Sequence, residues 1–265
     1  MSPAALFVIG LIAFAASALT LFAGFGLGTL LLPVFALFFP VEVAVAATAV
    51  VHGLNSLFKV ALVGRHADRS VVLRFGLPAV AAAFAGAALL AALASRPPVR
   101  LVWPWGTAEV PPVQIGMGIL ILLFAIVELV PERLVALRLP ARWLPLGGLL
   151  SGFFGGLSGH QGALRAIFLR RAGLNPRAFA GTQSILALLV DAARLLVYGA
   201  AAWGRHFGAL TSEGAAQPVV VGTLCAFAGA FMGSRLFPKV TIGAVQKLVG
   251  LLLIVTGAGL ATGLL

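Results

Sequence analysis

One stretch of the sequence departs from its hydrophobic surroundings: Ala23-Gly24-Phe25-Gly26-Leu27-Gly28-Thr29-Leu30-Leu31-Leu32-Pro33. This glycine-rich break has a counterpart half a chain later, Gly155-Gly156-Leu157-Ser158-Gly159-His160-Gln161-Gly162. Two such interruptions, one in each half of a membrane chain, are the best sequence indication of a transporter's binding site. We therefore expect the rest of the chain to be arranged around this pair.

The composition indicates a membrane protein. Of the 265 residues, 61% are hydrophobic and 9% are charged, whereas a soluble domain has about 25% charged residues. The sequence thus predicts an all-α polytopic membrane protein. Its net charge of +11 would indicate nucleic-acid binding in a soluble protein, but here it fits basic cytoplasmic loops, and we expect no nucleic-acid partner. The lone Cys225 excludes an intrachain disulfide or a cysteine-rich metal site, and we expect neither a metal nor a cofactor.

Ten apolar segments are predicted. They cover residues 4–23, 27–39, 43–63, 71–94, 113–130, 144–157, 163–169, 177–201, 218–237 and 242–264. A spanning helix needs about 20 apolar residues, so the second, sixth and seventh segments are too short. Each of them borders a glycine break, which predicts short discontinuous or re-entrant helices there.

The two halves of the chain resemble each other. The matches, in order, are Ala44–Thr48 with Ala178–Thr182, Ala83–Ala87 with Ala226–Ala230, and the pair Gln114 and Gly118 with Gln246 and Gly250. Their near-constant offset indicates a duplicated unit of about five segments, although shared alanine-rich composition is the alternative. The predicted repeats are residues 1–139 and 140–265, which form one integral membrane domain.

The basic residues predict the orientation of these repeats. Four loops, after the third, fifth, seventh and ninth segments, hold Arg65, Arg69, Arg74, Arg133, Arg138, Arg142, Arg170, Arg171, Arg177, Arg235, Lys239 and Lys247. If these loops are cytoplasmic, segments 1 and 2 together, and likewise 6 and 7, start and finish on one side. The repeats are then inverted in the membrane, and both termini are external.

The third segment carries a polar stripe. His52, Asn55, Ser56 and Lys59 lie at i, i+3, i+4 and i+7, which is one face of a helix. Ionisable groups inside a membrane usually face a cavity or a partner. The stripe is therefore a candidate lining of a substrate pathway; the alternative is helix–helix hydrogen bonding, with Lys59 reaching the membrane surface.

The eighth segment offers a second polar set. Thr182, Gln183 and Ser184 open it, and Asp191 and Arg194 follow at i and i+3. Arg194 is a candidate anion ligand through charge-assisted hydrogen bonds, whereas we expect Asp191 to form a structural ion pair. Thr48 and Thr182 occupy matching repeat positions, where their hydroxyls would bond either a ligand or a neighbouring helix.

The glycine breaks themselves favour anion binding. A helix that begins after a break directs unpaired N–H groups and the positive end of its dipole inward. The expected ligands of the first break are Gly26, Gly28 and Thr29. Those of the second break are Ser158, Gly159, His160, Gln161 and Gly162. The alternative, tight helix crossing, suits Gly86 and Gly229 but does not explain the short segments. His160 would either bond a carbonyl or couple transport to protons.

These features resemble the TauE/SafE family of sulfite and sulfonate exporters. The resemblance rests on Gly24-x-Gly-x-Gly28 with Pro33 beyond it, Ala44-x-Ala-x-Thr48, a basic loop, and a second glycine-rich break about 130 residues further on. It covers essentially the whole chain. It implies transport of small sulfur-containing or organic anions across the bacterial inner membrane. The second break departs from the family's commoner run of glycines through Ser158, His160 and Gln161.

The sequence thus favours a secondary transporter, and not an enzyme, that moves a small anion such as sulfite or a sulfonate by alternating access. Its expected partners are the anion, membrane lipids and, as a coupling ion, protons. One alternative is a passive anion channel. The other is a rhomboid-like intramembrane serine protease, because Gly156-Leu157-Ser158-Gly159 fits G-x-S-G. That mechanism needs a separate histidine base; His160 is close in sequence, His206 falls in a predicted external loop, and only His52 is placed to reach.

Overall fold

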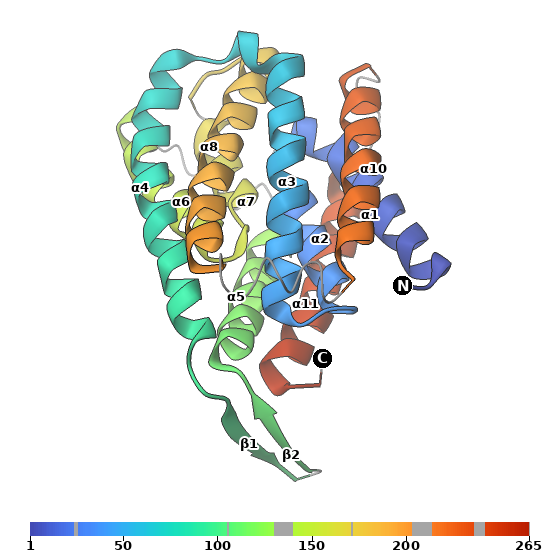
Figure 1. Ribbon diagram of the computed structural model, residues 1–265. Helices are drawn as coiled ribbons and strands as arrows, with labels where there is room; N and C mark the ends of the chain where they lie inside the picture. The colour runs from blue at the N-terminus through green and yellow to red at the C-terminus, as the bar shows by residue number, and fades with distance from the viewer. Residues whose placement is uncertain are drawn as a thin grey trace.

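The chain forms a bundle of helices with one small β-hairpin (Figure 1). The computed structural model describes residues 1–23, 26–104, 106–129, 140–170, 172–202, 214–235 and 242–264. The helices are α1 (Pro3–Ala23), α2 (Leu27–Ala36), α3 (Val41–Val63), α4 (Arg69–Ala94), α5 (Pro112–Leu129), α6 (Leu144–Ser158), α7 (Gly162–Leu169), α8 (Pro176–Ala202), α10 (Ala216–Arg235) and α11 (Ile242–Thr262). Two short 3-10 turns, η1 (Gly64–His66) and η2 (Ala141–Trp143), precede α4 and α6.

The lengths and composition of these helices confirm an all-α polytopic membrane protein. Within the described ranges, five stretches are long and apolar enough to cross a membrane: Pro3–Thr20, Val43–His66, Arg69–Ala94, Pro176–Ala200 and Ala216–Arg235. The helices next to the glycine breaks are short, as predicted: α2 has 10 residues, α6 has 15 and α7 has 8. The chain therefore carries two interrupted helical units, one in each half.

The largest helix–helix interfaces each join a helix from one half of the chain to a helix from the other half. They join α4 to α6, α1 to α10, α5 to α11 and α3 to α8. If α1 to α5 correspond in order to α6, α7, α8, α10 and α11, the first two interfaces are equivalent and the last two each join corresponding helices. Two related halves would produce this pattern; the division at residues 139 and 140 stays a prediction.

Glycines bring the equivalent interfaces close. A Cβ on Gly86 of α4 would overlap the Phe153 carbonyl oxygen of α6, and a Cβ on Gly229 of α10 would overlap the Phe14 carbonyl oxygen of α1. Small residues allow helix backbones to approach where lipid supplies no hydrophobic drive. The packing role that the sequence assigns to Gly86 and Gly229 is thus confirmed.

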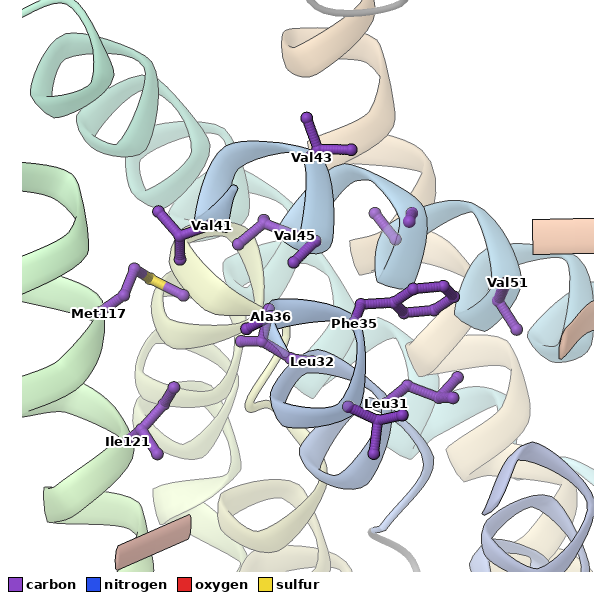
Figure 2. Packing of buried hydrophobic residues seen from close by; sticks show 14 of the residues in the cluster. Leu31, Leu32, Phe35, Ala36, Val41, Val43, Val45, Val51, Met117 and Ile121 are labelled. Carbon is purple, nitrogen blue, oxygen red and sulfur yellow. The ribbon is translucent and has the colours of Figure 1, made fainter. Parts of the chain in front are cut away.

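The helix α2 lies inside the bundle. Figure 2 shows its Leu32 and Ala36 below Val45 of α3, with Val41 of α3 and Met117 of α5 to their left. Its described residues carry no charged side chain. The helix ends at Ala36, three residues before the predicted end at Phe39, and residues 37–39 form a turn that leads to Pro40 at the start of α3.

The hairpin was not predicted. Strands β1 (Val99–Trp103) and β2 (Gly106–Val110) pair antiparallel, with Val99 opposite Val110. The signal is local: β1 is rich in β-formers, and Pro104 and Gly106 (φ +155°) flank the turn. The hairpin projects from the end opposite η1, and both termini lie toward the hairpin end (Figure 1).

Some sequence predictions fall outside the described residues. These concern Gly24 at the start of the first break, the basic residues Arg133, Arg138, Arg171 and Lys239, the side chain of Lys247, and His206. The cytoplasmic assignment of the basic loops therefore stays a prediction.

Candidate functional site

The two glycine breaks meet inside the bundle. Gly26 (φ +130°) precedes α2, and Gly159 (φ +83°) ends α6. A Cβ on Gly28 would lie 3.1 Å from the Gly159 carbonyl oxygen and 3.4 Å from Cδ2 of His52. The start of α2, the end of α6 and the middle of α3 therefore touch at one place, although their residues lie far apart in the sequence.

Asp191 of α8 connects these elements. Its Oδ2 accepts hydrogen bonds from His52 Nδ1 (2.6 Å) and Ser56 Oγ (2.9 Å), both on α3. Its Oδ1 accepts from Gln161 Nε2 in the second break (3.0 Å) and lies 2.9 Å from Nη2 of Arg194. The carboxylate has no exposed surface, so these contacts replace its lost hydration. The predicted ion pair with Arg194 is present, but it is one part of a larger network.

Arg194 directs unused donors toward the second break. Its guanidinium is fully buried. Its Nε and Nη1 have no well-aligned hydrogen-bond acceptor among the described residues, and the Tyr198 hydroxyl lies beside the guanidinium. The contact of Nη2 with Asp191 is an ion pair without hydrogen-bond alignment. A Cβ on Gly159 would overlap Nη1, so an added side chain there would require the guanidinium to move. Buried donors of this kind are costly unless a partner binds them.

The guanidinium of Arg165 is connected to the Asp191 network through the side chain of Gln161. Nη1 of Arg165 donates to Oε1 of Gln161 (2.7 Å), and the Gln161 amide nitrogen bonds Asp191. The backbone carbonyl of Gln161 accepts from Ser151 Oγ (3.0 Å). Gln161 thus fixes the second break to α6, α7 and α8. Neither Arg165 nor Asp191 was among the predicted ligands; their position as ionisable residues inside the membrane was the available signal.

The other half of the α3 stripe faces α1 and α10. Ser17 Oγ lies 3.0 Å from the Asn55 amide. This amide satisfies its neighbours when its oxygen accepts from Lys59 Nζ (3.2 Å) and its nitrogen donates to the Ala226 carbonyl (3.2 Å). Lys59 is 5% exposed, so it lies inside the protein and not at the membrane surface. The stripe therefore divides, with His52 and Ser56 on the α8 side.

The buried charges of the described residues do not balance. Arg165 and Arg194 carry two positive charges against the one carboxylate of Asp191, and Lys59 is a further buried basic group. At least one positive charge therefore remains unpaired inside a medium where unpaired charge is expensive. The first-turn N–H groups of α2 and α7, at Gly28, Thr29 and Gly162, have no acceptor in the described ranges and add positive potential. The arrangement is suited to an anion.

Ser158 and His160 are in contact, but not as a nucleophile and its base. Ser158 Oγ donates to the Phe154 carbonyl oxygen (3.0 Å), while His160 Nδ1 lies 3.0 Å from the same Oγ. Because the hydroxyl proton is directed to Phe154, Nδ1 must donate to the oxygen, which is the opposite of base catalysis. The imidazole ring stacks on Phe124, with centroids 5.1 Å apart.

Three predicted hydroxyl ligands lie apart from this network. Thr182 Oγ1 accepts from the Asp68 backbone N–H (2.9 Å), and Ser184 Oγ donates to the Ala180 carbonyl (2.7 Å). Thr48 is buried one helical turn before His52, and its Oγ1 has no partner among the described residues. Thr182 thus holds the start of α4, and the matching repeat positions do not share a contact.

A polytopic helical bundle with broken helices that meet at buried positive charge is typical of membrane transporters. The family comparison agrees: residues 9–260 match the family described as "Sulfite exporter TauE/SafE". The chain belongs to this family, as its glycine breaks indicate, and is at this level a sulfite or anion transporter of the membrane. No functionally curated protein and no solved structure shows a significant match.

Proposed function

We propose that the chain is a secondary transporter that binds a small oxyanion, such as sulfite or a sulfonate, where the two glycine breaks meet. The observation that carries this proposal is the excess of buried positive charge at that place. Arg194 supplies guanidinium donors that have no well-aligned hydrogen-bond acceptor among the described residues. Backbone N–H groups come from Gly28, Thr29 and Gly162. The nearby basic side chains of Arg165 and Lys59 add positive electrostatic potential. Planar guanidinium donors suit the paired oxygens of such anions.

The burial of the site favours a carrier over a permanently open channel. Asp191, Arg194 and Gln161 have no exposed surface, so an anion reaches them only after helices move. In the proposed cycle, α1 to α5 and α6 to α11 act as inverted repeats that rock against each other, and the site opens to one side at a time. The basic loops then lie in the cytoplasm, and both termini lie outside a bacterial inner membrane.

Flux measurements test the proposed transport. Purified protein in liposomes is given labelled sulfite, methanesulfonate and acetate, with empty liposomes as the control. Saturable sulfite or sulfonate flux is the expected result. Flux that rises linearly with concentration would indicate a channel, and no flux of any of the three anions would contradict the proposal.

Site-directed labelling tests the topology separately. In a Cys225→Ser background, single cysteines at Ser2 and Thr262 are exposed to a membrane-impermeant maleimide on intact cells. We expect both to react, because both termini are external in the proposed arrangement. Reaction only after the membrane is broken would contradict it.

A further inference from the structure

We propose that His52 is the proton carrier of this transporter, and that its Nε2 takes up one proton with each anion bound and releases it on the other side. This inference rests on the proposed function and deepens it. The sequence had indicated His160 for proton coupling; the contacts of the two histidines favour His52.

The contact with Asp191 fixes the tautomer of His52. The carboxylate pairs with Arg194, so it acts as an acceptor, and the 2.6 Å contact requires the proton on Nδ1 of His52. Nε2 then has a free lone pair, and it is the atom that gains or loses a proton. A carboxylate behind Nδ1 also stabilises the imidazolium that forms, as in hydrolase triads.

The free edge of the imidazole faces the proposed anion site. A Cβ on Gly28 would lie 3.4 Å from Cδ2 and 3.8 Å from Nε2 of His52, so the ring lies against the start of α2. An anion held by the N–H groups of Gly28 and Thr29 is therefore next to Nε2. Proton and anion then neutralise each other, which lowers the cost of moving charge through the membrane.

The neighbouring groups act on His52 in both directions: Asp191 favours a protonated ring, whereas the positive charges of Arg194 and Lys59 oppose it until an anion is bound. The titratable residues of α3 and of the elements packed on it are Glu42 and Lys59 on α3, Arg65 and His66 on η1, Glu128 on α5, Arg177, Asp191, Arg194 and Tyr198 on α8, and Cys225 and Arg235 on α10. The side chains of Glu42 and Glu128 lie outside the described set, and the described part of α2 contributes none. Among the described side chains, Asp191 is the group hydrogen-bonded to the His52 ring, with Ser56 Oγ at 3.4 Å from Nδ1.

His160 lacks this arrangement. Its Nδ1 contacts the Ser158 hydroxyl, and no carboxylate contacts its ring among the described residues. Its Nε2 is buried without a partner in the same part of the chain, and one ring face is covered by Phe124. A charged His160 would contact no carboxylate among the described residues, whereas a charged His52 would contact Asp191, which it shares with Arg194.

The test measures anion and proton movement together. Liposomes that contain the full-length protein and an internal pH-sensitive dye receive labelled sulfite or methanesulfonate. In the wild type we expect internal acidification with anion uptake. For methanesulfonate, which carries a single negative charge, we also expect roughly tenfold accumulation for each unit of imposed pH gradient, acid outside. His52→Gln keeps a donor for Asp191 but cannot carry a proton, so we expect it to lose both effects while it retains anion–anion exchange. The matched control His66→Gln, in the turn after α3, should behave as the wild type.

The possible outcomes separate a failure of the proton-carrier inference from a failure of the proposed transport. Gradient-driven accumulation by His52→Gln would overturn the inference. If that variant does not fold, as judged by lost exchange and aggregation, the wild type still decides: anion flux without proton movement overturns the inference and leaves the proposed transport intact. No flux of any tested anion overturns the proposed function and, with it, this inference.

Discussion

The two glycine breaks occupy similar places but differ in chemistry. The first, before α2, presents backbone N–H groups, and α2 is otherwise packed among apolar side chains. The second, between α6 and α7, brings Gln161 into a network with Asp191 and Arg165, and Gly159 lies against Arg194. The first break thus contributes the partial positive charges of backbone N–H groups, whereas the second contacts the full charges of ionised side chains. Two breaks of similar sequence need not have the same chemistry, and we expect substitutions at the second break to have the larger effects.

Arg194→Gln should have the largest effect on transport. The variant loses the buried charge whose hydrogen bonds to the proposed anion would be worth about 1.5–3 kcal/mol each, and a loss of about 2.7 kcal/mol corresponds to roughly a hundredfold. We expect labelled-anion flux to fall by about this factor. Arg194→Lys, which keeps the charge but not the planar fork, is the matched variant and should lose less. Near-normal flux in Arg194→Gln would contradict the role of the second break.

Gly159→Ala and Gly28→Ala compare the breaks directly. At Gly159 a Cβ would overlap Arg194 Nη1, and φ is +83°, which costs a non-glycine residue roughly 1–3 kcal/mol. At Gly28 the tightest contact would be 3.1 Å, from a helical position. We expect flux to fall about tenfold or more in Gly159→Ala and several times less in Gly28→Ala. Equal losses would mean that the breaks contribute equally.

Ser158→Ala tests the side chain that distinguishes the second break most visibly in the sequence. Because its hydroxyl donates to the Phe154 carbonyl within α6, we expect flux to change by no more than about threefold. The measurement is the same flux assay, with Ser151→Ala as a contrast, since Ser151 holds the Gln161 carbonyl. A large loss of flux in Ser158→Ala, without a loss in Ser151→Ala, would indicate that the Ser158 hydroxyl binds the anion.

The smallest expected effects concern the matching threonines. Thr182→Val removes the acceptor of the Asp68 N–H and should destabilise the protein by about 1 kcal/mol. Thr48→Val removes a buried hydroxyl without a partner in the described residues, so its thermal transition in detergent should be unchanged or higher. A lowered transition in Thr48→Val and not in Thr182→Val would reverse this comparison.

Sequence reasoning predicted the helices well, because glycine breaks and apolar runs are local signals. Breaks before Leu27 and before Gly162 lie where they were expected. The α3 stripe and Arg194 are buried, and their predicted role as pathway or anion ligands stays a prediction. The β-hairpin was missed, since its strands have only 5 residues each within a chain dominated by helical patterns.

The centre of the network could not be predicted from spacing. Asp191 has a partner three residues away in Arg194, so an intrahelical pair accounted for it fully. Its contact with His52 joins residues 139 positions apart, and only tertiary packing of α3 on α8 creates it. For Thr182 the sequence pattern indicated a role that its contacts do not show. Thr182 matches Thr48 in the repeat pattern, but its hydroxyl oxygen accepts a hydrogen bond from the Asp68 N–H in the turn before α4.

Anion binding to the purified protein tests the central claim most directly. The thermal transition is measured with rising sulfite or methanesulfonate for the wild type and for an Asp191→Asn, Arg194→Gln double variant, which removes one charge of each sign and so avoids an unpaired carboxylate. We predict that the wild type gains about 2.7 kcal/mol of stability at a hundred times its dissociation constant, and that the double variant gains none. Equal stabilisation of both proteins would contradict an anion site at the meeting of the two breaks.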